Sequence, residues 1–490
     1  MSDSAPTPPP SSTGARVATG ATWIYAYRWI DRGLNFLSLL VVARCLSKED
    51  FGLVAIAASY IFIIEGLSEF DVKNALIRSR ADDRQLFDTA WTLAAIRGLL
   101  ASLVLLAVSP IDPRITATVC VLAIVPLLDG TANPRFVVFE RELNYKRLAA
   151  MTLIGTVASV SVTVGLALAY RTHWALVLGI IAGSVARMVS TYALRPYRPS
   201  VTLRRWREIF GFSGWMSLAT VVSTLSMRTD RIVIGGLIGP GAAGSYDMTQ
   251  RIGVLPTAEL ISPLQRVLFP SFSQMADDHP RLRRAALESV NVLASLSLPS
   301  ACGFALIAND FVPIALDQEY LSIAPLLAVL VPFLGLRATL SNARPCVMAL
   351  GRTGLMFRVS LIYALVHFPA FFVATALYGL SGAIWAIVLA GFLYFYLNAW
   401  LLRETLGITL GEILTQLQRP VLAVAVMVGA VLTLHAAVPL DLFSAEGSWL
   451  ALSIKMAVGG LAFTAALLGL WRLTGRPEGF ERRVLGALRR

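Results

Sequence analysis

Several long apolar stretches of this 490-residue chain contain charged side chains, among them seven arginines. A charged group at the centre of a membrane helix costs about 2.5–3.5 kcal/mol on insertion scales, so it usually faces protein or water rather than lipid. The guanidinium group stays charged, and its planar fork binds phosphate oxygens in a bidentate manner. We therefore predict contacts with an anionic substrate for Arg28, Arg32, Arg97, Arg228, Arg231, Arg251 and Arg337.

The same stretches contain five acidic residues, which allow two interpretations of the charged set. These residues are Asp31, Glu65, Asp230, Asp247 and Glu259. In the first interpretation they form ion pairs that fix helix packing, for example Asp247 with Arg251 four residues later. In the second, the surplus arginines line a hydrated cavity, and a buried carboxylate such as Glu65 or its near equivalent Glu259 carries a coupling ion. The small excess of arginines favours some functional role, and both interpretations stay open.

Four polar residues of the first apolar stretch share one face of the expected helix. Arg28, Asp31, Arg32 and Asn35 follow one another at i, i+3, i+4 and i+7. If this face met lipid, its three charges would together cost roughly 8–10 kcal/mol. We therefore expect the face to point toward protein or a hydrated cavity.

The composition indicates a membrane protein built from helices. Of all residues, 56% are hydrophobic and 15% are charged, whereas soluble domains carry about 25% charged residues. Apolar windows of the roughly 20 residues that a bilayer requires recur from one end of the chain to the other. We predict an all-α polytopic membrane protein of about fourteen transmembrane helices, near 18–43, 51–72, 86–108, 115–138, 148–169, 174–194, 212–237, 243–268, 285–307, 321–348, 355–377, 381–402, 420–438 and 449–471.

Arginine and lysine gather in every second loop, and this pattern gives the orientation. Most of them lie in loops on the same side as the N-terminus, whereas the opposite loops carry only Arg44, Lys48, Arg114 and Arg171. By the positive-inside rule, both termini should lie in the cytoplasm. The N-terminus lacks the features of a cleaved signal peptide, so the first span should stay in the mature protein.

An internal repeat predicts how the helices are grouped. Residues 46–54 and 238–246 superpose at an offset of 192 residues, and each is a short outer turn that leads to a glycine at the start of the next helix. A six-helix unit duplicated in tandem predicts two halves related by an axis along the membrane normal, with the substrate path between them. The expected parts are a disordered cytoplasmic tail (1–17), an N-terminal lobe (18–194), a basic linker (195–211), a C-terminal lobe (212–402), helices 13 and 14 (403–472) and a basic tail (473–490).

The sequence does not support enzyme chemistry or nucleic-acid binding. Residues 239–244 match GxGxxG, but they fall between two membrane helices rather than after a strand. The histidines and cysteines are scattered without the spacing of metal ligands, and the outer loops are short for a glycosyltransferase or ligase. The net charge of +12 resides in short loops rather than on one soluble face. We expect no catalysis, no metal, no nucleic-acid partner and no cofactor beyond coupling H⁺ or Na⁺.

Five segments resemble a known family of bacterial transporters. They are ARCLSKEDFGLVA (43–55), NALIR (74–78), TDRIVIGG (229–236), GSY (244–246) and ISPLQRVLFP (261–270). Together with the helix number and the duplication, they resemble the lipopolysaccharide (O-antigen) and exopolysaccharide flippases of the multidrug/oligosaccharidyl-lipid/polysaccharide superfamily. Within that superfamily, the chain looks most similar to the colanic-acid and teichuronic-acid exporter branch.

The resemblance implies a V-shaped cavity between two lobes, and alternating access in the bacterial inner membrane. It further implies undecaprenyl-pyrophosphate-linked oligosaccharide repeat units as substrate, and the polysaccharide polymerase and chain-length machinery as partners. A multidrug antiporter of the same superfamily is the alternative, although arginines in the cavity would repel cationic drugs. A membrane-bound polymerase or ligase is a further rival, which the short outer loops disfavour.

Overall fold

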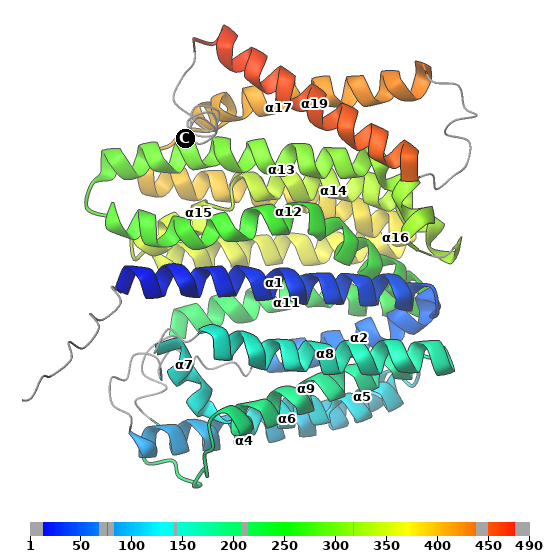
Figure 1. The fold of residues 1–490 in the computed structure, drawn as a ribbon, viewed down its shortest axis with the longest axis vertical. Coiled ribbons are helices and arrows are strands. Elements are labelled where there is room, and N and C mark those ends of the chain that lie inside the picture. The colour runs from blue at the N-terminus through cyan, green and yellow to red at the C-terminus, as the bar shows by residue number, and fades with distance from the viewer. Residues whose placement is uncertain are drawn as a thin grey trace, which may run out of the picture. The chain divides into compact units, whose positions relative to one another are not determined.

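The chain folds into two compact units of helices, shown as a ribbon in Figure 1. Unit 1 comprises Met1–Leu46 and Tyr60–Ser217, and unit 2 comprises Ser47–Ser59 and Leu218–Arg490. The helix α2 (Lys48–Leu67) therefore contributes its first half to unit 2 and its second half to unit 1. The computed structural model describes residues 13–67, 76, 83–141, 145–206, 214–316, 318–437 and 449–475. Residues 1–12, 207–211 and 476–490 of the expected tails and linker lie outside these ranges.

Unit 1 consists of α1 and a group of helices that follows α2. Its elements are α1 (Thr13–Ala43), α4 (Arg84–Val108), η1 (Ser109–Ile111), α5 (Thr116–Leu122), α6 (Ile124–Gly130), η2 (Pro134–Phe136), α7 (Val137–Arg141), α8 (Tyr145–Tyr170) and α9 (Trp174–Leu194). Within this unit α8 packs against α1 and α9, and α6 packs against α4 and α9.

Unit 2 contains the remaining long helices, among which α12 (Pro240–Gln274) and α13 (His279–Ala315) run side by side in Figure 1. Its elements are α11 (Gly214–Leu237, mainly in this unit), α12 (Pro240–Gln274), α13 (His279–Ala315), η3 (Gln318–Ile323), α14 (Ala324–Thr339), α15 (Ala343–Ala349), α16 (Thr353–Leu406), α17 (Leu410–Ala437) and α19 (Trp449–Leu473). Here α13 is the central helix, since α12, α14, α17 and α19 all pack against it.

Prolines interrupt the helices in two of the expected spans, and one glycine marks the junction of two further spans. Pro126 offers no N–H to the Leu122 carbonyl and its ring would clash with that carbonyl, and α5 ends at Leu122. Pro345 likewise offers no N–H to the carbonyl of Ser341, which lies in the break between α14 and α15. Gly379 takes φ 61° and ψ −144° inside α16, so this element contains the two spans expected on either side of that residue.

The structure bears out the all-α membrane class. The described residues contain no strand, and eight of their helices are long and apolar enough to cross a membrane. Counting α5 with α6, α14 with α15, and α16 as two, the membrane helices fit the expected number of fourteen. Many leucine, valine and phenylalanine side chains on the helix surfaces are exposed, as expected where lipid rather than water surrounds the protein.

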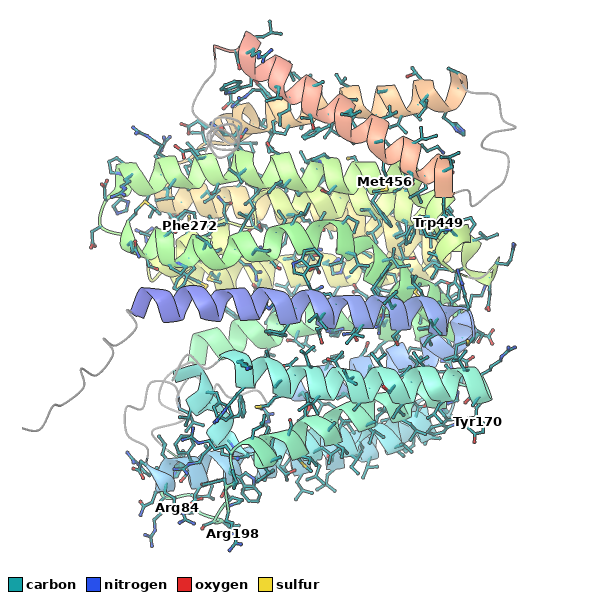
Figure 2. The ribbon with its side chains drawn as sticks, viewed as in Figure 1. Arg84, Tyr170, Arg198, Phe272, Trp449 and Met456 are labelled. Atoms are coloured by element: carbon teal, nitrogen blue, oxygen red, sulfur yellow. The ribbon has the colours of Figure 1, made fainter. Side chains whose placement is uncertain are left out.

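Each unit has its own apolar core. In unit 1, Leu86, Phe87 and Val137 belong to a cluster at one end of the helices. At this end the Arg84 Nη2 donates to the Arg198 carbonyl oxygen (3.4 Å), and Figure 2 shows Tyr170 at the opposite end of the unit. In unit 2, the main core joins α12, α13, α15, α16 and α17, and includes buried Phe272.

The two copies of the repeated turn meet within unit 2. A Cβ atom on Gly52 of α2 would lie 1.7 Å from the carbonyl oxygen of Pro240, and one on Gly244 of α12 would lie 1.7 Å from the carbonyl oxygen of Lys48. Gly244 is equivalent to Gly52, and Pro240 to Lys48, at the 192-residue offset, so each repeat places its glycine against the same backbone position of the other repeat. The starts of α2 and α12 therefore approach closely only because both positions lack a side chain.

Candidate functional site

The polar face of α1 divides between a neighbouring helix and the exterior of unit 1. Thr156 of α8 donates to Asp31 Oδ1 at 2.5 Å, and Asn35 Nδ2 donates to the Asp31 carbonyl oxygen at 2.8 Å. Arg28 is half-buried and Arg32 is exposed. The expected inward direction thus holds for Asp31, while the substrate role of Arg28 and Arg32 stays a prediction.

Arg97 belongs to a cluster at the meeting point of α4, α6 and α9. It interacts electrostatically with Asp129 of α6, and the Nη2 of Arg187 lies 3.8 Å from Asp129 Oδ1. Asp129 and Arg187 are not among the predicted residues, although both are ionisable and lie inside expected spans. Glu65 is half-buried in the second half of α2, and its coupling role stays a prediction.

In unit 2, one buried carboxylate binds arginines from two helices. Asp247 of α12 lies 2.6 Å from the Nε of Arg231 and 2.5 Å from the Nε of Arg251. The second distance confirms the ion pair expected from the i, i+4 spacing. Arg228, one turn before Arg231 on α11, interacts electrostatically with this group. Three guanidinium groups therefore interact with one carboxylate, and these four side chains together carry a net positive charge.

Asp230 is the centre of a second buried network, which the sequence analysis did not assemble. Its Oδ2 accepts a hydrogen bond from the Tyr246 hydroxyl (2.9 Å), and its Oδ1 lies 3.4 Å from the Nε2 of His367. Gln250 Nε2 donates to the same tyrosine hydroxyl at 2.8 Å. His367 belongs to α16 and lies 137 positions after Asp230 in the sequence. The one feature of the sequence that could have indicated it is that a histidine lies inside an apolar span.

Arg337 extends this polar region through aromatic rings. Its guanidinium carbon lies 4.6 Å from the ring centre of Tyr394, and that of Arg344 lies 5.9 Å from the same centre. Tyr363 touches the Tyr394 ring edge-on and stacks on His367 at 5.2 Å. A cation over an aromatic face contributes about 0.5–2 kcal/mol, more when water is excluded. The rings thus link Arg337 of α14 to the Asp230 network.

The remaining predicted residue of this unit, Glu259, is half-buried on α12 and its coupling role stays a prediction. The described residues contain no group of three or more histidine, cysteine, aspartate or glutamate side chains that could hold a metal ion. The assembled groups are a cationic set around Asp247 and, beside it, a hydrogen-bonding network around Asp230. Such a set can bind phosphate oxygens, because guanidinium groups donate to them in a bidentate manner.

Comparisons with known proteins place this chain among polysaccharide biosynthesis proteins. A family model described as "Polysaccharide biosynthesis protein" matches residues 41–325. The chain is 22% identical over 427 residues to the lipopolysaccharide biosynthesis protein WzxC of Escherichia coli (strain K12), covering 85% of this chain and 82% of that protein. It is also 22% identical over 363 residues to the succinoglycan biosynthesis transport protein ExoT of Rhizobium meliloti (strain 1021), covering 72% of this chain and 74% of that protein.

A solved structure shares the fold. The lipid II flippase MurJ in an inward closed conformation superposes with a TM-score of 0.72 at 14% identity, and the match covers 91% of this chain and 98% of that one. At this identity the likeness concerns the arrangement of the helices and not the substrate.

Proposed function

Because the chain belongs to the family of polysaccharide biosynthesis proteins, we propose that it transfers undecaprenyl-pyrophosphate-linked oligosaccharide repeat units from the cytoplasmic to the outer leaflet. The transfer supplies the synthesis of a surface polysaccharide, such as lipopolysaccharide or exopolysaccharide, and proceeds by alternating access. The lipid chain stays in the bilayer while the pyrophosphate and the sugars pass through a hydrated, cationic path.

The observation that carries this proposal is the positive surplus around Asp247. A pyrophosphate headgroup crosses hydrocarbon poorly because its charges lose their water. Arg251 is bound to Asp247 through Nε, yet 54% of its side chain is exposed, so its terminal nitrogens can donate to phosphate oxygens. Arg228 interacts with the same group from α11. Together these guanidinium groups replace part of the water that the headgroup gives up.

The proposal is tested by measuring transfer in proteoliposomes. A lipid-linked oligosaccharide with a labelled terminal sugar is placed in one leaflet, and a membrane-impermeant glycosidase reports its arrival in the other. Arg228→Ala should lower the rate roughly tenfold or more, because a hydrogen bond to a charged group is worth about 1.5–3 kcal/mol. Arg358→Ala is the matched control, since Arg358 is exposed on α16 and should leave the rate unchanged.

Wild-type rates for the Arg228 variant at equal protein content would remove this residue from the mechanism. In cells, a deletion strain should accumulate inward-facing lipid-linked oligosaccharide. Sensitivity to cationic drugs with intact surface polysaccharide would instead establish the multidrug alternative. Purified protein that joined repeat units would establish the polymerase or ligase alternative, and with it an enzyme.

The proposal places the protein in the cytoplasmic membrane of a bacterium, with both termini inside. Reporter fusions at residues 171 and 490 test this orientation, since only the first should be reached from outside. Transfer is expected to use a gradient of H⁺ or Na⁺, with the polymerase and chain-length machinery acting on the product.

A further inference from the structure

His367 occupies an unusual place for a histidine in a membrane helix. It lies near the middle of the first half of α16, is 3% exposed, and faces Asp230 of α11 across 3.4 Å. Asp230 is 7% exposed and receives a second hydrogen bond, from the Tyr246 hydroxyl of α12. Ionisable residues inside membrane spans are rare and usually mark pathways of ions or protons. Here a histidine and an aspartate connect three helices of unit 2.

The hydrogen-bond pattern assigns different roles to the two ring nitrogens of His367. With Asp230 ionised, its carboxylate only accepts hydrogen bonds, and Nε2 is then the nitrogen that carries the hydrogen facing Asp230. The other nitrogen, Nδ1, is buried and has no hydrogen-bond partner among the described residues. In the neutral ring this nitrogen holds a lone pair, which is the atom that takes up a proton. A buried polar atom without a partner is uncommon and calls for an explanation.

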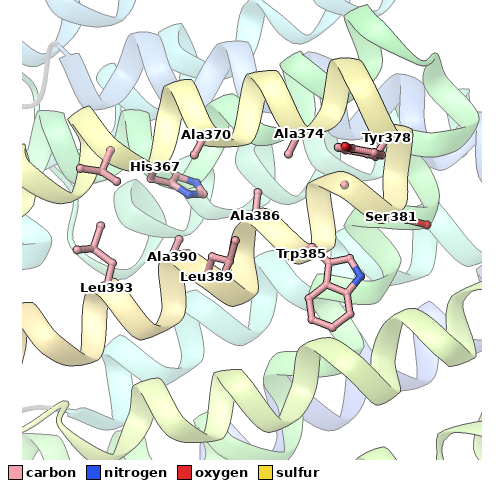
Figure 3. Close-up of a pocket in the computed structure, with 12 residues that line it drawn as sticks. His367, Ala370, Ala374, Tyr378, Ser381, Trp385, Ala386, Leu389, Ala390 and Leu393 are labelled. Carbon is pink, nitrogen blue, oxygen red and sulfur yellow. The ribbon is translucent and has the colours of Figure 1, made fainter.

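A groove between the two halves of α16 borders the ring. Its volume is about 660 Å³, and its walls are mostly apolar, with Ala370, Ala374 and Ala386 among the lining residues. Figure 3 shows His367 pointing into this groove. From there the groove extends to Tyr378 and Ser381, beside the kink at Gly379. The ring therefore lies in the wall of an apolar groove, while its Nδ1 atom is itself buried.

Few charged groups act on His367 from the helices packed around it. Asp230 is the carboxylate in direct contact, and Tyr363 stacks on the ring within α16. Arg231 from α11 and Tyr246 from α12 act on Asp230. Arg337 from α14 and Tyr394 from α16 act on the stacked Tyr363, and the neutral Gln250 donates to Tyr246. Histidine is the side chain whose ordinary titration falls nearest neutral pH, so it is the group of this set suited to change charge in a cell.

We propose that His367 binds a proton at Nδ1 during the transport cycle, and that this proton switches the contact between α16 and α11. The inference rests on the proposed function for its role in transfer, and it names H⁺ as the coupling ion. Without the proton, the two helices share one long hydrogen bond. With it, an imidazolium faces the Asp230 carboxylate and the contact becomes an ion pair. A change of this kind can bias an equilibrium between two conformations, and a pH gradient then drives the cycle in one direction.

The transport test compares His367→Gln with wild type in proteoliposomes. Glutamine can still donate to Asp230, but it does not titrate. For wild type, a difference of one pH unit should change net transfer by up to about tenfold. The variant should keep its exchange rate without a gradient and lose the response to the gradient. His435→Gln is the matched control, because His435 is exposed on α17 and the variant should respond like wild type. A His367→Gln variant that still responds to the gradient overturns the proposal.

A second test does not depend on the substrate. Proton uptake by the purified protein is measured in detergent between pH 8 and pH 5. His367→Gln should take up about one proton fewer than wild type. Equal uptake by wild type and His367→Gln overturns proton binding at this site. If uptake differs but no lipid-linked oligosaccharide is transferred by wild type, the proposed function fails and the proton site stands.

Discussion

Replacing Gly52 by alanine should destabilise the protein through a single methyl group. The added Cβ would lie 1.7 Å from the Pro240 carbonyl oxygen and 2.5 Å from its carbon, whereas real Cβ contacts essentially never fall below 3.0 Å. The starts of α2 and α12 would have to separate by at least about 1.3 Å, and both obstacles are backbone atoms that no rotamer change can move. Overpacking typically costs about 1–3 kcal/mol, against a gain in helix propensity of up to about 1 kcal/mol. Because the overlap is with backbone atoms, the upper part of this range, about 2–3 kcal/mol, applies, and we expect a net loss of about 1–2 kcal/mol.

The effect is measured by thermal unfolding of the detergent-purified protein. Gly236→Ala is the matched control, because a Cβ at this position meets no atom within 4 Å and the substitution should be neutral or slightly stabilising. Gly244→Ala should resemble Gly52→Ala, since its Cβ would lie 1.7 Å from the Lys48 carbonyl oxygen. The double variant should lose less than the sum, because both methyl groups push apart the same pair of helices. A Gly52→Ala protein that unfolds at the same temperature as Gly236→Ala would refute the close approach.

Three further predictions concern polar contacts. Lys455→Met should destabilise the protein by about 3–5 kcal/mol, because it leaves the Asp310 carboxylate without the buried Lys455 Nζ that lies 2.8 Å from its Oδ2. The double variant Lys455→Met, Asp310→Leu should recover most of this loss in a thermal unfolding assay. Tyr246→Phe should cost about 1–3 kcal/mol, since it removes the donor to Asp230 and the acceptor for Gln250; an unchanged unfolding temperature would count against this network. Hydrogen bonding from the Arg114 side chain lowers the pKa of Asp112 in the loop after α4, so the pair stabilises the fold above the ordinary pKa of 3.8 and the effect is lost as the pH falls. The difference in unfolding temperature between wild type and Asp112→Asn should therefore shrink below about pH 4.

Much of the architecture could be predicted because it depends on local properties of the chain. The transfer free energy of about twenty apolar residues selects each span, and the spans predicted from the sequence fit the observed helices. The ion pair of Asp247 and Arg251 follows from helix periodicity alone. The ends and breaks of helices were predicted less accurately. The helix α1 begins at Thr13 rather than near residue 18, and helices break near Pro126 and Pro345 where hydropathy predicts continuous spans.

The candidate site was predicted only in part, because its contacts join distant parts of the sequence. Arg231 of α11 pairs with Asp247 of α12, and Arg187 of α9 pairs with Asp129 of α6. Neither pair follows from the spacing of residues within one helix. Asp310 and Lys455 were missed although both lie in the apolar part of their helices. A search for every ionisable residue inside a predicted span would have found Asp129, Arg187 and Lys455, but neither their pairing nor Asp310, which follows the span predicted to end near residue 307.

The sequence by itself determined that the chain is a helical membrane protein with a tandem repeat, since hydrophobicity and the recurrence of a turn are written along the chain. It also determined which side chains are too polar to face lipid. Only the tertiary structure decided that Gly52 and Gly244 touch the opposite repeat, and that His367 faces Asp230. The physical reason is that helix periodicity decides which residues of one helix share a face, whereas the packing of neighbouring helices decides which faces meet.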